Sequence, residues 1–197
     1  MIPETEKFNK VIEKIDELNA RDPHQEGVEG VQRSRELLYS KRLTEWVLKL
    51  EPEPSETLRI AARGQHICRW TVPRDRYPMT RGGYLRWRED LKKFHAGKVG
   101  EIMREAGYPE HTIEKVSSII QKKNLNEPET QTVEDALCLE FLCTQFSDLK
   151  SKTPPDKMKE IVLKTWKKMS PKAQETALGL DLKAEEKQFL QQVLKRE

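Results

Sequence analysis

Apolar residues recur at intervals of three and four along most of the chain, which is the spacing typical of amphipathic α-helices. The first stretch, with Phe8, Val11 and Ile15, shows the pattern clearly. We expect nine helices, over residues 8–18, 37–50, 58–70, 84–106, 113–120, 132–146, 158–169, 171–179 and 189–194. Expected helix starts are capped by Ser34, Ser55, Thr132 and Ser170, and expected helix ends are marked by Gly107 and Gly179.

Strand patterns are missing from the sequence. No run of four to eight residues alternates apolar and polar positions with β-branched enrichment, so we predict an all-α protein. Residues 22–31, rich in glycine and proline, are predicted to form a loop. There is no repeat and no long linker, so we expect a single domain over residues 1–197, a helical bundle of about eight or nine helices.

Composition narrows the class of protein further. The 197 residues carry 36 Lys and Arg against 33 Asp and Glu, a net charge of +3 that does not by itself indicate nucleic-acid binding. The three cysteines form no CxxC pair, so neither a disulfide framework nor a zinc knuckle is expected. No apolar stretch approaches roughly 18 residues and the first residues lack signal-peptide features, which predicts no membrane partner and a cytoplasmic location, with the nucleus left open.

Three ionisable residues lie where the helical pattern places the core. His66 shares a predicted face with Leu58 and Ala62, and His95 lies four residues from Leu91 and from Val99. Asp135 precedes Leu139, Leu142 and Phe146 at helical spacing. A buried carboxylate needs a partner or a cation, and two imidazoles with a carboxylate are typical ligands of a first-row metal ion. Glu134, beside Asp135, is a candidate for orienting a ligand or moving a proton.

The same residues have a structural interpretation. A histidine on an apolar face is more often a hydrogen-bonded core residue than a metal ligand. Asp135, three residues after Thr132, could complete a capping arrangement at the start of its helix. The sequence leaves both interpretations open.

A cluster of arginines and aromatic residues surrounds the two histidines. Six arginines alternate with four large aromatic residues between Arg69 and Arg88. Guanidinium groups bind phosphate or carboxylate in a bidentate manner, and aromatic rings stack on planar groups. The alternative is that the aromatic residues anchor a loop and the arginines stack on them or pair with nearby acids. The candidate residues for binding a substrate are Arg69, Trp70, Arg81, Tyr84 and Arg88.

The order of these residues resembles the HD-domain superfamily of all-α metal-dependent phosphohydrolases, some of whose members are di-iron oxygenases. The resemblance covers about residues 33–146, with the helices of about 154–196 expected to pack on that core. His66 corresponds to the histidine of the His-Asp pair, His95 to the next ligand, and Asp135 to the closing aspartate. The resemblance therefore implies one divalent metal ion, iron, manganese or zinc, held by these three residues.

The chain also departs from that pattern. Ile67 stands where the aspartate of the pair should be, Tyr39 or Ser40 replaces the first histidine, and no histidine occurs near Lys122. The run His66-Ile67-x-Arg69-Trp70, Tyr84-Leu85-x-Trp87-Arg88 and Glu134-Asp135-x-x-Cys138 is more similar still to an uncharacterised microbial family whose members are sometimes labelled glutamyl-tRNA synthetases. The chain has no dinucleotide-type glycine loop and no βαβ alternation to support that label.

Two functions follow as hypotheses. In the first, a metal-dependent hydrolase or oxygenase acts on a small substrate that bears a phosphate or carboxylate, with Glu134 as the acid-base group. In the second, an inactive HD-like module binds a nucleotide, an RNA or an acidic partner without turnover. The missing aspartate after His66 favours the second hypothesis, and the oligomeric state is left open.

Overall fold

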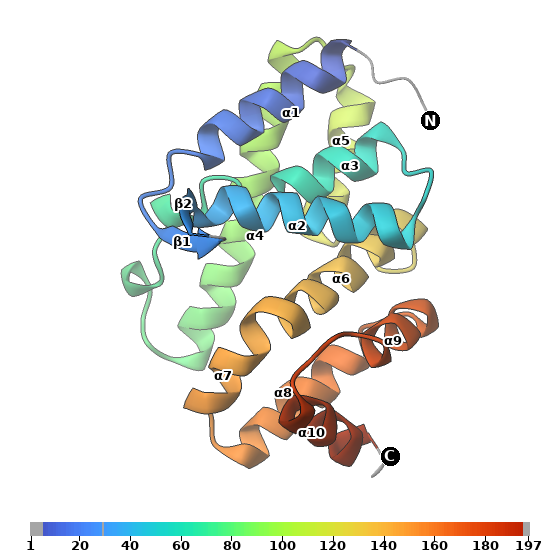
Figure 1. The fold of residues 1–197 in the computed structure, drawn as a ribbon. Coiled ribbons are helices and arrows are strands. Elements are labelled where there is room, and N and C mark those ends of the chain that lie inside the picture. The colour runs from blue at the N-terminus through green and yellow to red at the C-terminus, as the bar shows by residue number, and fades with distance from the viewer. Residues whose placement is uncertain (1–5, 29, 195–197) are drawn as a thin grey trace. The chain divides into compact units, whose positions relative to one another are not determined.

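The computed structural model describes residues 6–28 and 30–194, and these residues are mainly α-helical, which confirms the all-α prediction (Figure 1). The chain divides into two compact units, Met1–Thr130, here called unit 1, and Gln131–Glu197, here called unit 2. The division falls inside one helix, α6, over Pro128–Glu140. The single domain over 1–197 and the HD-like core over about 33–146 stay predictions.

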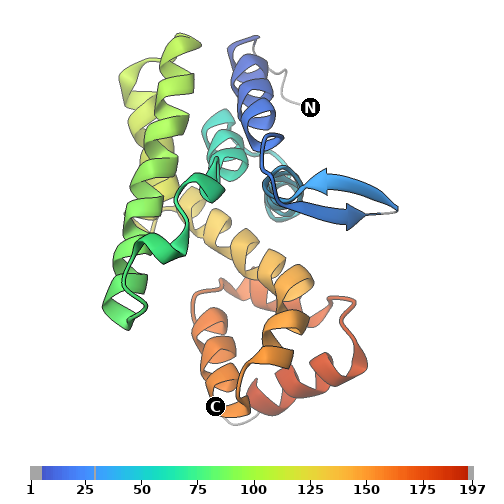
Figure 2. The same ribbon diagram turned by 90° about the vertical axis from the view of Figure 1, so that its left-hand side faces the viewer.

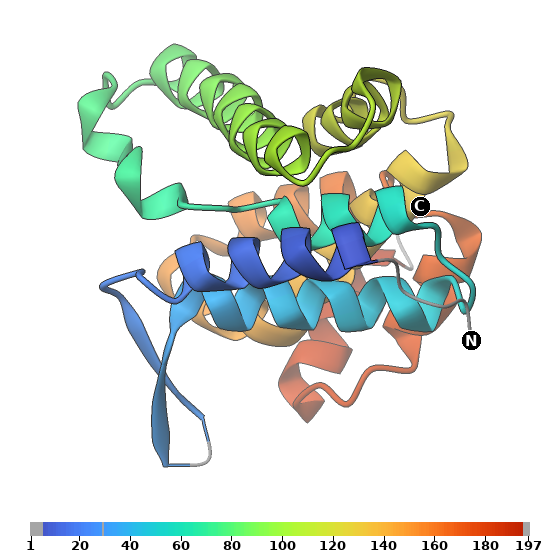
Figure 3. The same ribbon diagram turned by 90° about the horizontal axis from the view of Figure 1, so that it is seen from above.

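Over residues 6–28 and 30–127, unit 1 contains five helices ahead of α6. They are α1 (Glu6–Asn19), α2 (Arg35–Leu50), α3 (Glu56–Gly64), α4 (Arg81–Glu105) and α5 (Glu110–Gln121). Two short 3₁₀ turns, Arg69–Thr71 and Arg74–Arg76, lead from α3 to α4. The long helix α4 lies beside α5, and α1 lies beside α2 and α3 (Figure 3).

The core of unit 1 is formed by the apolar faces that the spacing predicts. Its buried residues include Val11, Ile15, Leu43, Val47, Leu58, Val99, Met103, Ile113 and Ile120. The helices α3 and α4 approach closely at Gly64, where a β-carbon would lie 2.3 Å from Cγ2 of Val99. This contact requires a residue without a side chain, and it brings the end of α3 onto the second half of α4, at Val99.

Several predicted helix ends are confirmed. The Ser55 hydroxyl accepts a hydrogen bond from the Leu58 N–H, and Ser170 caps α9 in the same way through the Ala173 N–H. Gly107, with φ of +79°, follows the end of α4. The predicted cap at Thr132 is wrong, because α6 begins four residues earlier at Pro128 and Thr132 lies within it.

The prediction of a loop over residues 22–31 is also wrong. The strands β1 (Gln25–Val28) and β2 (Val31–Ser34) pair antiparallel, with Gln25 opposite Ser34, and the hairpin extends away from the helices of unit 1 (Figure 2). The local sequence has little strand pattern, and contacts with residues outside the strands hold the hairpin in place. The Ser34 hydroxyl donates to the Ala20 carbonyl over 2.7 Å, and Glu26 pairs with Arg42 of α2 at 2.7 Å.

Unit 2 continues α6 and, up to residue 194 where the described part ends, adds four helices. A π-helical turn, Phe141–Gln145, leads to α7 (Phe146–Lys152), which is followed by α8 (Pro155–Trp166), α9 (Pro171–Leu178) and α10 (Ala184–Leu194). Its core includes Phe146, Met158, Val162, Leu190 and Val193. Ring centroids of Phe146 and Phe189 lie 6.2 Å apart, so unit 2 has an apolar core of its own.

Candidate functional site

His66 lies in a turn of unit 1 and not in a helix. The predicted helix over 58–70 ends at Gly64, and Cys68 adopts a left-handed conformation with φ of 53°. Two hydrogen bonds tie this turn to distant helices: the Asn19 side chain of α1 accepts from the Cys68 N–H over 3.2 Å, and the Gln65 side chain of the turn donates to the Ile120 carbonyl of α5 over 3.2 Å. These hydrogen bonds to distant residues hold the segment as a turn, although its local sequence pattern favours a continued helix.

The turn places the His66 ring between two residues of α2. The ring stacks on Tyr39, with centroids 4.3 Å apart and planes 7° from parallel. Nδ1 of His66 lies 3.6 Å from a carboxylate oxygen of Glu36. Burial, followed by the charges of Arg69, Arg88 and Lys122, holds the pKa of His66 well below its usual range, so the imidazole is neutral at pH 7.

His95, on α4, is buried, and its ring centroid lies 5.8 Å from that of the partly exposed His66. Nδ1 of His95 lies 2.8 Å from the Ile67 carbonyl oxygen. A carbonyl only accepts, so Nδ1 carries the proton and Nε2 bears a lone pair. Within the described part of the chain Nε2 is buried and has no hydrogen-bond partner. Burial, more than the nearby charges, keeps the pKa of His95 well below its usual range.

Arg69 and Arg88 bring positive charge to this pair of histidines. Both guanidinium groups lower the pKa of His66 and of His95. Arg69 lies over the Trp87 ring, 4.8 Å from its centroid, and Trp87 donates through Nε1 to the Val72 carbonyl over 2.9 Å. Burial lowers the pKa of Arg69, and the charge of Glu36 acts in the opposite direction. Arg69 is thus a partly desolvated cation held on an aromatic ring.

The other predicted substrate-binding residues differ in exposure. Arg81 is the exposed first residue of α4. Tyr84 is 44% exposed, and its ring centroid lies 5.9 Å from that of Trp87. Trp70 is half-buried in the first 3₁₀ turn. Whether these three bind a substrate stays a prediction.

Glu36 is a member of the cluster that sequence reasoning missed. Its side chain is 6% exposed, and burial raises its pKa to about 7 despite the charge of Arg69. The signal was present in the sequence, because Glu36 precedes Ser40, Leu43 and Val47 at helical spacing on the buried face of α2. Its own N–H donates to the buried Asp22 carboxylate over 3.0 Å.

Asp135 and Glu134 belong to unit 2, where both have local partners. One oxygen of Asp135 accepts hydrogen bonds from the Ser170 N–H and the Gln131 side chain, each over 2.8 Å. The other accepts from the Ser170 hydroxyl over 2.5 Å. Glu134 is buried with Oε1 3.2 Å from Nζ of Lys168. Within unit 2, Asp135 therefore holds Ser170 at the start of α9, and Glu134 pairs with Lys168 in the connection between α8 and α9.

Unit 1 therefore brings together two of the three predicted metal ligands, His66 and His95, and two of the predicted anion-binding arginines, Arg69 and Arg88. Among residues 6–28 and 30–194, no group of three His, Cys, Asp or Glu side chains is arranged to hold a metal ion. A metal site that includes Asp135, and a catalytic role for Glu134, stay predictions.

In class, the chain is an all-α protein with a cluster of neutral histidines and arginines in its first unit. Residues 9–190 match the model of the family described as domain of unknown function DUF4202, and the chain belongs to that family. This confirms the uncharacterised family that the sequence indicates. The search of curated proteins found no match, and neither did the search of solved structures. None of the helices in the described residues combines the length and apolarity that crossing a membrane requires.

Proposed function

We propose that unit 1 binds a small ligand bearing a phosphate or carboxylate beside His66 and His95. The observation that carries this proposal is the positive charge around His66, whose side chain is 21% exposed: Arg69, Arg88 and Lys122 all lower its pKa. Like charges gathered at a partly buried position repel one another, and a bound anion offsets that repulsion. Glu36 offsets it only in part, because its pKa of about 7 leaves it near half-ionised at neutral pH.

Neutral histidines suit such a site. An imidazole that stays unprotonated accepts a proton or a hydrogen bond from the ligand, and the arginines supply the donors that a phosphate or carboxylate needs. Arg69 is oriented for this task by the Trp87 ring beneath it. The same residues also fit a module that binds a nucleotide, an RNA or an acidic partner and catalyses no reaction.

A divergent HD-like metal centre is the second candidate, and one observation favours it. Nε2 of His95 has a buried lone pair whose orientation is fixed by the hydrogen bond from Nδ1 to Ile67, which is how metal-binding histidines are usually held. Iron, manganese or zinc bound here would polarise a substrate oxygen or activate a water molecule. His66 and Glu36 are the nearest further ligands.

Two features weigh against the metal. The same charges that disfavour a proton on His66 also disfavour a divalent cation. Asp135 already accepts three hydrogen bonds, two from Ser170 and one from Gln131, which leaves about one lone pair for a metal ion. The HD-like layout expects histidines at about the positions of Tyr39 and Lys122. Tyr39 stacks on His66 and Lys122 lowers its pKa, so both positions lie near His66, which supports the layout. Lys122 then supplies a fixed positive charge at a position where the HD pattern has a metal ligand.

Titration of the protein with inorganic phosphate and with acetate, followed by histidine ring resonances in NMR spectra, tests the proposal. We expect the resonances of His66 and His95 to shift with a common dissociation constant, while those of His24 and His111 stay in place. Replacing Arg69 or Arg88 by Met should weaken binding at least tenfold, since each removes a charge-assisted contact. Arg86→Met, an exposed position on the same helix as Arg88, is the matched control.

The outcomes separate the candidates. If neither anion shifts His66 or His95, anion binding at this cluster is refuted. Elemental analysis of the purified protein, together with melting temperatures measured with added iron, manganese and zinc, addresses the second candidate. A stoichiometric metal that is lost in His95→Gln would favour the metal-dependent enzyme, and a protein whose melting temperature ignores all three ions would argue against it.

A further inference from the structure

The first turns of α4 expose apolar side chains of unit 1. Met79, just before the helix, is 80% exposed, Leu85 is 56% exposed and Tyr84 is 44% exposed. They are three of the seven large apolar side chains that are exposed among residues 6–28 and 30–194, and they lie within one short segment. Large apolar side chains gathered at one exposed place are typical of a surface that another molecule covers. In Figure 2 the start of α4 extends beyond α1, α2 and α3.

Arg81, the first residue of α4, belongs to the same place. Residues three and four positions apart are neighbours on a helix, so Arg81 lies beside Tyr84 and Leu85. Met79 lies two residues before Arg81. We call these four residues, Met79, Arg81, Tyr84 and Leu85, the α4 surface. It combines exposed apolar groups with a guanidinium.

The backbone that carries the α4 surface is held in place by local contacts. The Thr80 hydroxyl accepts a hydrogen bond from the Gly83 N–H over 3.1 Å. Gly83 lies against the preceding loop, where a β-carbon would be 2.1 Å from the Pro78 carbonyl oxygen. That oxygen also accepts a hydrogen bond from Arg74 over 2.8 Å. Because the start of α4 is fixed in this way, less entropy is lost when a partner binds to it.

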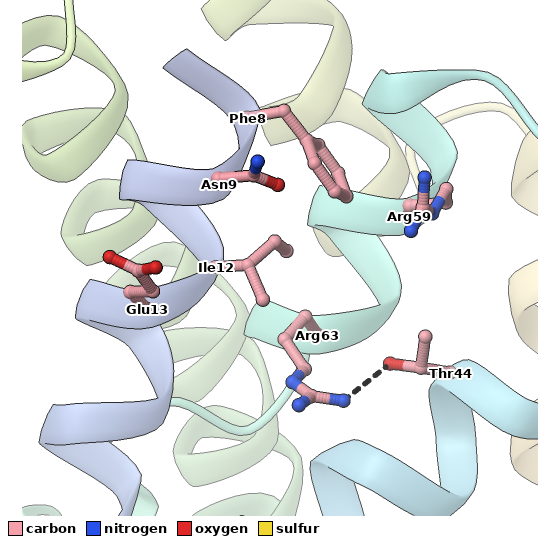
Figure 4. Close-up of a pocket in the computed structure, with 7 residues that line it drawn as sticks. All are labelled: Phe8, Asn9, Ile12, Glu13, Thr44, Arg59 and Arg63. Carbon is pink, nitrogen blue, oxygen red and sulfur yellow. Dashed lines mark hydrogen bonds between the residues drawn. The ribbon is translucent and has the colours of Figure 1, made fainter. Parts of the chain in front are cut away.

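Other arginines of unit 1 already have partners. In the pocket between α1, α2 and α3, Arg59 lies over the Phe8 ring (Figure 4). Arg63, in the same pocket, binds the Asp16 carboxylate over 2.6 Å. Arg81 differs from both, because its exposed side chain has no hydrogen bond, ion pair or ring contact with any of the residues that the structure describes. Its charge is therefore available to a partner.

Positive charge is in surplus around the α4 surface. Residues 69–90 contain six arginines against three acids. Two of these acids already have partners of their own: Glu89 pairs with Lys92 over 3.1 Å, and Asp90 accepts a hydrogen bond from the Tyr77 hydroxyl. Complementary charge steers partners together and determines which of them bind. The surplus at this surface therefore favours an acidic partner.

The residue types favour a protein over a nucleic acid as that partner. Arginine, tyrosine and methionine are enriched and lysine is depleted where proteins contact each other, and residues 69–90 contain no lysine. Met79 and Leu85 are the most exposed residues of the surface, and their aliphatic side chains offer nothing to a phosphate. A second copy of the chain, bound through the same surface, would bring Arg81 close to its own counterpart.

From these features we propose that the α4 surface docks an acidic segment of another protein. A carboxylate of that segment binds Arg81, and a large apolar side chain next to it packs on Met79 and Leu85. This surface does not depend on the anion site proposed beside His66 and His95.

Selection of short random peptides displayed on phage tests the proposal. The immobilised bait is the full chain, and the Leu85→Glu variant is added in excess as a soluble competitor, so that peptides bound elsewhere are removed. We expect the recovered peptides to carry a net negative charge and at least one large apolar residue. The fluorescence anisotropy of one labelled peptide then gives its affinity for each variant.

Arg81→Glu and Leu85→Ser should each weaken peptide binding at least tenfold, since both residues lie at the centre of the proposed contact. Both are exposed, so the melting temperatures should stay near that of the wild type. Arg86→Glu is the matched control, because it makes the same change of charge at an exposed position on a different side of α4, and it should keep the affinity of the wild type. A peptide whose acids are replaced by lysine should bind Arg81→Glu better than it binds the wild type.

Three results would overturn the proposal. The first is recovery of no peptide, or of peptides without an excess of acids. The second is a loss of affinity in Arg86→Glu as large as that in Arg81→Glu, which would show a general effect of charge. The third is a different occupant: a labelled oligouridylate that binds more tightly than the peptide and is lost in Arg81→Glu, or a dimer in sedimentation experiments that Leu85→Ser dissociates.

Discussion

Replacing Glu36 by Gln should make the protein more stable at alkaline pH and leave it almost unchanged near pH 4.5. In the folded chain burial raises the pKa of this carboxyl from its usual 4.5 to about 7. The folded state therefore holds a proton that the unfolded chain releases between these two pH values. Unfolding then becomes more favourable as the pH rises through this window, and the free energy of unfolding falls.

The magnitude follows from the width of that window. Each pH unit between the two pKa values contributes about 1.4 kcal/mol, so full ionisation of a buried Glu36 costs about 3 kcal/mol of stability. A glutamine keeps the size of the side chain and cannot ionise. We therefore expect Glu36→Gln to exceed the wild type by about 3 kcal/mol at pH 8 and to differ from it by less than about 1 kcal/mol at pH 4.5.

Urea unfolding at both pH values, followed by tryptophan fluorescence, measures the effect. Trp166 is replaced by Phe in every variant, so that the remaining tryptophans, Trp46, Trp70 and Trp87, all report on unit 1. Glu45→Gln, an exposed position on the same helix, is the control, and its stability difference from the wild type should not depend on pH. A stability gain of Glu36→Gln that is equal at both pH values would refute a buried, protonated Glu36.

Two further predictions concern stability. Asp135→Ala removes the acceptor of two hydrogen bonds from Ser170 at the start of α9 and of a third from Gln131 in α6, and should destabilise unit 2 by about 3 kcal/mol. Urea unfolding followed by the fluorescence of Trp166, which these variants retain, measures the loss. Asp148→Ala, at an exposed ion pair, should cost less than about 1 kcal/mol, and equal costs would contradict the role of Asp135. Gly64→Ala places a β-carbon 2.3 Å from the Val99 side chain and should lower stability by about 2 kcal/mol. Gly97→Ala, whose β-carbon meets nothing within 4 Å beyond its own helix backbone, should raise stability by up to about 1 kcal/mol. Similar changes in the two glycine variants would show that α3 and α4 are not in close contact.

The helices of this protein are largely predictable from local pattern. Ser55, Ser170 and Gly107 act at helix ends because their side-chain or backbone properties suit those positions in any fold. The apolar faces of α1, α2 and α5 are buried as their spacing predicts. The local pattern does not predict the hairpin, because its strands are held by contacts with residues outside them, Ala20 and Arg42.

The candidate site was predictable only in part. The spacing predicts His66 and His95 on apolar helix faces, and the two rings do lie close together. The reasoning for His66 was nevertheless wrong, because the helix ends at Gly64 and the side chain belongs to a turn. Glu36 was overlooked, although its spacing from Leu43 and Val47 places it on a buried face.

Local pattern alone fixes the helical class, most helix positions and the burial of His95, because these depend on periodicity and on residues three or four apart. Tertiary structure decided the rest. Asn19 and Gln65 hold the His66 turn through hydrogen bonds to residues 49 and 55 positions away, and Ser170 binds Asp135 over 35 positions. No local pattern encodes such pairs, because the energy of a buried hydrogen bond depends on which distant partner the folded chain brings within reach.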